Sequence, residues 1–412
     1  MDRSLIDTRL LFSTRIVRLF AYGLLSVVLV LYLSEAGLAE AQIGLLLSLA
    51  LLGDTAISLW ITTHADRFGR RRMLVIGALL MVFAGILFAL TRNFGLLLLA
   101  ATIGVISPSG NEVGPFLSIE QAGLTQLVGD QRRTQVFAWY NLAGSFATAS
   151  GALCGGGLAQ LLDVAGLSEL DSYRLVVIGY SLLGLALFGL FIRLSPQVDA
   201  QTQIDAADRA DAGRMFLGLG RSRRVILGLA ALFSLDAFAG GLIIQSLVAY
   251  WFHQRFGVEP AMLGGIFFGA NILAGVSALS AVWLAKRIGL INTMVFTHIP
   301  SNLLLMLVPL MPNLSLAIAL LLLRFSISQM DVPTRQSYTM AVVDPDERSA
   351  AAGVTGTART IGAALSPALA GSMLANPALM GAPFLIAGGL KILYDLALYR
   401  SFQAIKPPEE RR

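Results

Sequence analysis

Long apolar stretches, separated by short polar segments with charged, Gly and Pro residues, occur along almost the whole chain. Residues 74–90 and 175–192 are examples, and neither contains a charged side chain. The hydrocarbon core of a bilayer is about 30 Å thick, so a helix needs about 20 apolar residues to cross it. Strands of a transmembrane barrel would instead alternate over about ten residues. The pattern therefore predicts an all-α polytopic membrane protein.

Twelve transmembrane helices are predicted, with boundaries uncertain by a few residues. They cover residues 15–34, 41–63, 73–91, 96–121, 135–161, 173–194, 224–252, 261–285, 290–311, 314–340, 350–374 and 381–400. One long polar connection, residues 195–222, is rich in Asp, Ala and Arg. We therefore expect an N-terminal six-helix bundle (1–194), a cytoplasmic linker (195–222) and a C-terminal six-helix bundle (223–412).

The two predicted bundles repeat each other in sequence. Ala41-Gln42-Ile43-Gly44 aligns with Ala261-Met262-Leu263-Gly264, 220 positions later. The same offset places residues 65–69 on residues 285–289. Two pseudo-symmetric bundles of this kind have their substrate site near the middle of the bilayer, between the repeats.

The composition agrees with a membrane location. The chain of 412 residues is 56% hydrophobic and only 13% charged, with a mean hydropathy of +0.73, whereas soluble domains are about a quarter charged. The amino terminus runs into the first apolar stretch without a small-residue cleavage site, which predicts a retained helix. The net charge of +5 does not indicate nucleic-acid binding, because the arginines lie between the spans.

The positions of Arg and Lys predict the orientation. Cytoplasmic loops are enriched in both residues. Three arginines fall in one set of loops, Arg92, Arg174 and Arg255, and twelve basic residues fall in the other set: Arg67, Arg70, Arg71, Arg72, Arg132, Arg133, Arg221, Arg223, Arg224, Lys286, Arg287 and Arg348. We therefore expect both termini to be cytoplasmic, in the inner membrane of a bacterial cell.

The loop after the second span carries the sequence Thr-Thr-His-Ala-Asp-Arg-Phe-Gly-Arg-Arg-Arg, residues 62–72. It resembles the Gly-x-x-x-Asp-Arg-x-Gly-Arg-Arg loop of the major facilitator superfamily, with Thr62 in place of the first Gly. Residues 285–289 form a degenerate copy where that family has one. The resemblance covers nearly the whole chain, and it implies a secondary transporter with two six-helix bundles and alternating access.

In that family such a loop locks one conformation, so the resemblance implies a gating role. Its residues here are Asp66, Arg67, Gly69, Arg70 and Arg71, with Glu120 as a candidate partner of Arg70 or Arg132. A simple positive anchor at the cytoplasmic face is the alternative. Five glycines of the fifth span are also similar to the glycine motif of proton antiporters: Gly144, Gly151, Gly155, Gly156 and Gly157. The Gly-Pro step of that motif is missing, and close helix packing explains these glycines equally well.

Charged residues inside the spans are candidates for function, since each costs at least about 2.5–3.5 kcal/mol at the bilayer centre. Glu112, beside Asn111 in span 4, and Asp331 in span 10 occupy matching positions of the repeat, one residue off the common offset. Burial favours the protonated form of a carboxyl group, as proton coupling requires. The alternative is a structural ion pair, because Arg335 follows Asp331 by four residues.

Further charged candidates lie in other spans: Asp54, Asp236, Arg324, Arg335 and Arg359. These arginines either neutralise the carboxylates or hold an anionic substrate. Arg18 is expected to reach lipid headgroups from the inner end of the first span, and His298 is expected to be an interior histidine with its hydrogen bonds satisfied.

No phosphate-binding Gly-x-x-x-x-Gly-Lys-Ser/Thr sequence and no metal-ligand spacing of His or Cys occurs. We therefore expect no cofactor, no metal and no enzymatic activity. The predicted function is export of a small organic or toxic compound coupled to protons, by a monomer in the lipid bilayer. The alternatives are proton-coupled uptake of a small organic anion, and a non-transporting sensor or assembly protein.

Overall fold

The computed structural model describes residues 3–112, 114–128, 130–199, 220, 222–344 and 347–405, without the side chains of residues 66, 130–135, 138, 197 and 349. Within these ranges every regular element is a helix and no strand occurs. Eight described helical segments are long and apolar enough to cross a membrane, and α4 and α13 are shorter apolar helices. The expectation of an all-helical polytopic fold is confirmed.

Seven helices and one short 3-10 segment belong to the first repeat: α1 (Arg3–Glu35), α2 (Glu40–Phe68), α3 (Arg70–Leu90), α4 (Phe94–Ile103), α5 (Phe116–Leu127), α6 (Asp130–Val164), α7 (Glu169–Phe191) and η1 (Pro196–Asp199).

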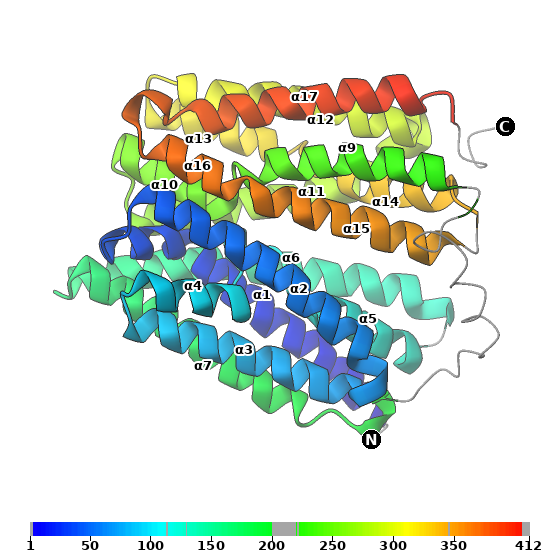
Figure 1. Cartoon of the computed structure of the whole chain (residues 1–412), viewed down its shortest axis with the longest axis horizontal. Coiled ribbons are helices and arrows are strands. Elements are labelled where there is room, and N and C mark those ends of the chain that lie inside the picture. Colours follow the sequence, from blue (N-terminus) through cyan, green and yellow to red (C-terminus); the bar gives the residue numbers. More distant parts are fainter. Residues whose placement is uncertain are drawn as a thin grey trace. The chain divides into compact units, whose positions relative to one another are not determined.

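The elements of the second repeat are α9 (Arg223–Gly241), α10 (Gln245–Phe256), α11 (Pro260–Ile288), α12 (Leu290–Leu307), η2 (Val308–Leu310), α13 (Leu314–Phe325), α14 (Asp331–Ala341), α15 (Arg348–Leu365), α16 (Pro367–Leu374), η4 (Pro377–Leu379) and α17 (Ala382–Phe402). Each of the twelve predicted spans coincides with one helix or with a pair of consecutive helices (Figure 1).

Four spans predicted as continuous are interrupted, which corrects the sequence-based expectation. Spans 4, 7, 10 and 11 divide into α4 and α5, α9 and α10, α13 and α14, and α15 and α16. The longest interruption covers residues 104–115, where Gly110 and Gly114 have φ of 71° and 81°. Left-handed backbone of this kind strongly favours glycine, and Pro108 and Pro115 cannot donate a helical hydrogen bond.

The internal repeat is visible in the turns of the structure. Gly37 and Gly257, which are 220 positions apart, both have positive φ, at 92° and 64°. Gly69 and Gly289, separated by the same offset, have φ of 98° and 87° and end α2 and α11. The repeated sequence therefore folds into repeated local structure.

The first helix of each interrupted pair in spans 4 and 10 also begins in the same way. Asn93 accepts a hydrogen bond from the backbone N–H of Leu96 at 3.2 Å, and Asn313 accepts one from Leu316 at 3.0 Å. An asparagine at this position satisfies one of the free N–H groups of the first turn. These pairs are again 220 positions apart, so spans 4 and 10 are structural equivalents.

The contacts of the chain define two compact units, which differ from the sequence halves. Unit 1 comprises Met1–Gln201, Ile244–Ile272 and Pro367–Asn376, and unit 2 comprises Thr202–Ile243, Leu273–Ser366 and Pro377–Arg412. In unit 1, α1 packs against α6, α7 and α10, while α2 packs against α4 and α16. In unit 2, α9 packs against α15 and α17, and α12 against α14 and α17. The domain boundaries at 195–222 stay a prediction.

In unit 1, two pairs of glycines bring helices of the first and second repeats together backbone against backbone, and we call these two contacts the glycine seam. A Cβ atom on Gly44 of α2 would lie 2.9 Å from the Cα of Gly371 in α16. A Cβ atom on Gly156 of α6 would lie 3.0 Å from the Cα of Gly264 in α11. Only glycine permits so close an approach. Gly44 and Gly264 are the repeated glycines of the sequence, so both repeats use the same residue for the same purpose.

Candidate functional site

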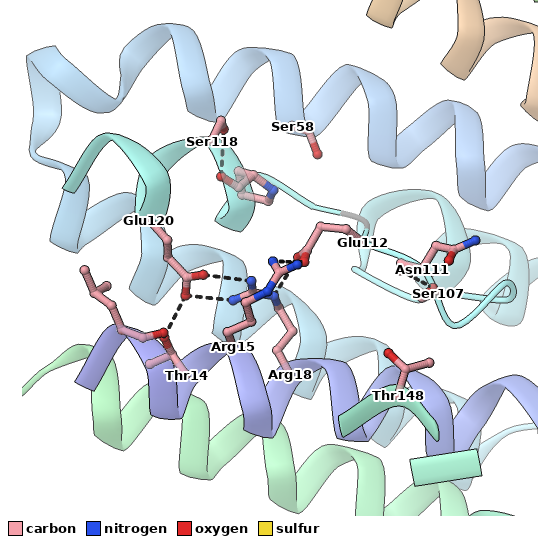
Figure 2. A network of polar contacts seen from close by, with 12 residues as sticks. Thr14, Arg15, Arg18, Ser58, Ser107, Asn111, Glu112, Ser118, Glu120 and Thr148 are labelled. Carbon is pink, nitrogen blue, oxygen red and sulfur yellow. Dashed lines mark hydrogen bonds and ion pairs between the residues drawn. The ribbon is translucent and has the colours of Figure 1, made fainter. Parts of the chain in front are cut away.

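Unit 1 contains a buried cluster of four charged side chains from α1, α5 and the interruption of span 4 (Figure 2). Arg15 Nη1 lies 2.8 Å from Glu112 Oε2, and Arg18 Nε lies 2.7 Å from Glu112 Oε1. Arg18 also forms a two-pronged pair with Glu120, at 2.7 and 2.8 Å. Two arginines therefore balance two carboxylates, and Arg18 joins the two halves of the cluster.

Glu120 is the most enclosed member of the cluster. Its side chain and that of Arg18 have no exposed surface. Besides Arg18, Thr14 Oγ1 donates to Glu120 at 2.7 Å, and the hydroxyl group of Tyr140 donates to its other oxygen. Four donors thus satisfy this buried carboxylate, which offsets the cost of removing it from water.

Glu112 reaches the arginines because span 4 is not helical at this point. Ser107 Oγ donates to the carbonyl of Asn111 at 2.7 Å, and Thr148 Oγ1 donates to the carbonyl of Gly110 at 3.4 Å. These bonds hold the unwound residues beside α1 and α6, and Figure 2 shows Glu112 extending from this segment towards Arg15 and Arg18. The Glu112 side chain keeps 16% of its surface exposed.

A chain of polar side chains lies near the same interruption. Asn271 Nδ2 donates to Gln245 Oε1 at 3.3 Å, and Gln245 Nε2 donates to Ser26 Oγ at 2.7 Å. The backbone N–H of Ser246 donates to the carbonyl of Pro108 at 3.2 Å. Irregular backbone at membrane depth is tolerated where it is buried in protein or lines a polar cavity, and interrupted helices are where transporters bind their substrates.

Asp54 of α2 differs from the two carboxylates of this cluster. Its side chain is buried, and it accepts a 3.4 Å hydrogen bond from Ser58 and one from the backbone N–H of Gly114. No cationic side chain of the described residues forms an ion pair with it. This acid therefore borders the interruption of span 4 without a counter-charge.

Unit 2 contains a second buried cluster, built around Asp236 of α9. Lys391 Nζ lies 2.6 Å from Asp236 Oδ1, and Arg335 Nη1 lies 3.2 Å from Asp236 Oδ2. The same Arg335 nitrogen lies 2.9 Å from Asp331 Oδ2. The i, i+4 pair expected between Asp331 and Arg335 is therefore present, as part of a larger network.

The second cluster continues to α12 and α17. His298 Nδ1 lies 2.9 Å from Asp395 Oδ1, and Asn302 Nδ2 donates to Asp395 Oδ2 at 3.2 Å. His298 Nε2 is also 4.0 Å from Asp236 Oδ1. His298 is thus an interior histidine with carboxylate neighbours, as the sequence predicted.

Two arginines of unit 2 lack such partners. Arg324, in the last turn of α13, and Arg359 of α15 form no hydrogen bond or ion pair with any other residue that the structure describes. The Nε atom of Arg324 is buried without a partner. Both arginines are nevertheless close enough to Asp236 and Asp331 to interact with them electrostatically.

Two sequence-based expectations are wrong. Arg18 does not extend to lipid headgroups, because α1 begins at Arg3 and places three further turns before it; Arg18 is instead enclosed between Glu112 and Glu120. Glu120 was expected to pair with Arg70 or Arg132, but its two oxygens are occupied by Arg18, Thr14 and Tyr140.

Three further charged members of the clusters, Arg15, Lys391 and Asp395, were not among the residues predicted from the sequence. Lys391 and Asp395 are charged residues within an apolar span, so the criterion that found Asp236 would also have found them. Arg15 lies at the predicted edge of its span, where a charged side chain is ordinary, and nothing in the sequence marked it.

The loop between α2 and α3 contacts the chain that follows α7. Asp199 Oδ1 accepts the backbone N–H of Arg71 at 3.0 Å, and Arg70 Nη1 donates to the carbonyl of Val198 at 3.4 Å. The Arg71 guanidinium donates to the carbonyl of Ile192. Arg67 is exposed over the ring of Phe68. The side chain of Asp66 lies outside the described part, so its gating role stays a prediction.

Four of the five glycines noted in α6 lie against neighbouring helices, whereas Gly157 borders open space. Cβ atoms on Gly151 and Gly155 would lie 2.0 and 2.3 Å from carbonyl oxygens of Phe20 and Leu24 in α1. These two positions therefore serve close helix packing. Among the described residues, no group of three or more His, Cys, Asp or Glu side chains is placed to hold a metal ion.

Buried, mutually paired charges beside interrupted helices in a polytopic helical membrane protein define a membrane transporter. The family model of the Major Facilitator Superfamily matches residues 11–410. The chain belongs to this superfamily and is a secondary transporter that crosses the membrane many times.

Among similar proteins, an uncharacterized membrane protein of Saccharomyces cerevisiae is 30% identical over 424 residues, covering 97% of this chain and 94% of that protein. The quinolone resistance protein NorA of Staphylococcus aureus is 35% identical over 85 residues, 21% of this chain and 22% of that protein.

Two solved structures share the fold. The nucleoside transporter NupG has a TM-score of 0.72 and 15% identity, over 98% of this chain and 100% of that chain. A D-xylose-proton symporter has a TM-score of 0.73 and 16% identity, over 96% and 97%.

Proposed function

We propose that this protein exports a small organic or toxic compound in exchange for protons, by alternating access. Asp54 is the observation that carries the proton-coupled part of the proposal. An ionised carboxyl in a low-dielectric interior is costly unless a cation neutralises it. Asp54 has hydrogen bonds from Ser58 and Gly114 but no cationic partner among the described side chains, so it is suited to bind a proton and to release it when its surroundings change.

The four carboxylates that are paired with arginine are less suited to that role. Glu112, Glu120, Asp236 and Asp331 each lie within 3.2 Å of an arginine nitrogen. An arginine remains charged and stabilises the ionised form of its partner. We propose that these pairs hold the helices in place and break only when the conformation changes, although Glu112 and Asp331 stay candidates for proton coupling.

Alternating access is supported by the composition of unit 1. This unit joins all the described elements of the first repeat to α10, the first half of α11 and all of α16, which belong to the second repeat. By the arginine distribution, the glycine seam lies at the external ends of these helices, and both termini lie in the cytoplasm. We infer that the seam closes the external side, while the α2–α3 loop and η1 stabilise the cytoplasmic side.

Export is favoured by the local similarity to a drug-resistance protein over 85 residues. We further propose that the protein works as a monomer, needs no cofactor, and resides in a bacterial inner membrane. The chain is also similar to a membrane protein from yeast. Localising the tagged protein in its own cells therefore tests which membrane it occupies.

The test uses inside-out vesicles with an acidic interior, reported by a quenched dye. Organic cations, neutral drugs and organic anions are added one at a time. We expect dequenching by at least one compound with the unaltered protein, and its loss in Asp54→Asn. Exchange of that compound at equal pH should persist in Asp54→Asn, because exchange without a gradient needs no net proton movement.

The matched control is Asp171→Asn, which removes a half-exposed carboxylate at the start of α7. This variant should retain full dequenching. Undiminished dequenching in Asp54→Asn would refute the coupling role of Asp54, and equal loss of dequenching and exchange would assign it to folding or substrate binding. No response to any compound from folded protein would contradict the export function.

A further inference from the structure

The charged groups that interact around Asp236 and Asp331 in unit 2 do not balance. The described cluster contains three carboxylates, Asp236, Asp331 and Asp395, and four permanent cations, Arg324, Arg335, Arg359 and Lys391. His298 adds a titratable group against Asp395. One positive charge is therefore in excess even when His298 is neutral. The cluster of unit 1 has two arginines and two glutamates and is balanced.

The excess charge lies with Arg359 and Arg324. Lys391 and Arg335 already share the two oxygens of Asp236, and Arg335 also holds Asp331. Arg359 lies within electrostatic range of Arg335 as well as of Asp236 and Asp331. Two like charges in a low-dielectric interior repel each other strongly, and an anion near both would relieve that repulsion.

The guanidinium N–H groups that have no acceptor match the oxygens of an acidic ligand. A guanidinium presents several N–H groups in a planar fork, which matches the oxygens of a carboxylate, phosphate or sulfonate. Arg359 has no hydrogen bond to any described residue, and the Nε of Arg324 is buried without an acceptor. Buried polar atoms are hydrogen-bonded in nearly all proteins, so the missing acceptor of the Arg324 Nε points to a ligand, to which the free donors of Arg359 can also bind.

The location also fits a transported compound. Arg324 lies in the last turn of α13, just before the interruption of span 10 at residues 326–330. This interruption is the structural equivalent of the one that holds Glu112 in span 4. Interrupted helices near the middle of the membrane are where secondary transporters bind substrates, whereas lipid headgroups lie at the membrane surface.

We propose that the transported compound carries an acidic group, and that Arg359, with Arg335 and Arg324, binds it in unit 2. This inference rests on the proposed function, because it names the chemical class of the compound that is carried. Asp331 and Asp236 keep Arg335 positioned while the site is empty. The bound anion supplies the hydrogen-bond acceptor that Arg359 and Arg324 lack.

The test measures thermal unfolding of the purified full chain in detergent by tryptophan fluorescence. The probes are three anions and their neutral counterparts: benzoate with benzamide, succinate with succinamide, and glycerol phosphate with glycerol. We expect at least one anion to raise the unfolding midpoint and its counterpart to leave it unchanged. The carboxylate and phosphate arms distinguish the two kinds of acidic group.

Arg359→Gln should weaken binding of that anion at least about 10-fold, the range expected for a lost charged hydrogen bond. Arg359→Lys, which keeps the charge but not the planar fork, should lose less. The matched control is Arg348→Gln, an exposed arginine at the start of the same helix, and it should bind as the unaltered protein does. If Arg359→Gln does not fold, Arg324→Gln replaces it, with the same weakening expected.

Equal stabilisation by anions and neutral counterparts would overturn the proposal, as would no stabilisation by any anion or unchanged binding in the folded variant. Stabilisation by phosphatidylglycerol alone would assign the arginines to lipid and also overturn it. The vesicle experiment with Asp54→Asn tests the proposed function independently of this inference. Proton-driven export of neutral compounds without anion binding would keep that function and reject this inference.

Discussion

Glu120→Gln changes a carboxylate to an amide of nearly the same shape at the centre of the unit 1 cluster. The amide has one oxygen where the carboxylate had two, and its NH2 group must face Arg18 or Tyr140, which are donors themselves. Arg18 is fully buried, so it cannot turn to water. Breaking a buried ion pair by removing one partner costs about 3–5 kcal/mol, and we expect a loss of that size.

The comparison that makes this test specific is Glu112→Gln, the same chemical change in the same cluster. Glu112 is partly exposed, and each of its arginines keeps another acceptor: the carbonyl of Tyr140 for Arg15, and Glu120 for Arg18. We therefore expect a smaller loss, about 1.5–3 kcal/mol, as for a single charged hydrogen bond. Equilibrium unfolding of the purified protein in mixed micelles with sodium dodecyl sulfate measures both losses.

A double variant separates charge from packing. Arg18→Met with Glu120→Met removes the pair together, and replacing a buried pair by apolar residues of similar volume is often neutral or stabilising. We expect the double variant to be more stable than Glu120→Gln alone. The reasoning is refuted if Glu120→Gln costs no more than Glu112→Gln, or if the double variant is the least stable of the three.

Two further predictions concern transport. The double variant Glu112→Gln/Asp331→Asn should lose gradient-driven transport and equal-pH exchange together. The reason is that Arg15, Arg18 and Arg335 lose ion-pair partners. Selective loss of gradient-driven transport would instead assign the proton-carrying role to these two acids. Asp66→Asn should slow turnover with little change in substrate affinity, if the α2–α3 loop is a gate. Initial rates over a range of substrate concentrations measure both quantities, and a collapse of affinity at full turnover would contradict the gating role.

The sequence predicted the helices well because hydropathy and charge are local properties. The twelve spans, the 220-residue repeat and the turns at Gly69 and Gly289 all follow from residues within one element or its flanks. The interruption of span 4 was missed, although Pro108, Gly110 and Pro115 signalled it. Its surroundings are apolar enough that the hydropathy pattern continues through it.

The partners in the clusters could not be predicted from the sequence. Arg18 lies about a hundred residues from Glu112 and Glu120, and only the packing of α1 against the rest of unit 1 brings them together. The same holds for Asp236 and Lys391, which are 155 positions apart. Asp331 and Arg335 are the instructive exception, because both lie on one helix face and their pairing could be expected.

Mutations in the glycine seam can change the distance between its helices in one direction only, towards separation. A Cβ atom would lie 2.5 Å from the carbonyl oxygen of Pro367 at Gly44, 2.3 Å from that of Glu40 at Gly371, and 2.1 Å from that of Pro260 at Gly156. Every substitution at these positions adds atoms, and none can remove any. Mutation of these glycines can therefore push the helices apart but cannot draw them closer. Many different single changes lead to the separated arrangement, and none of them leads to a tighter one.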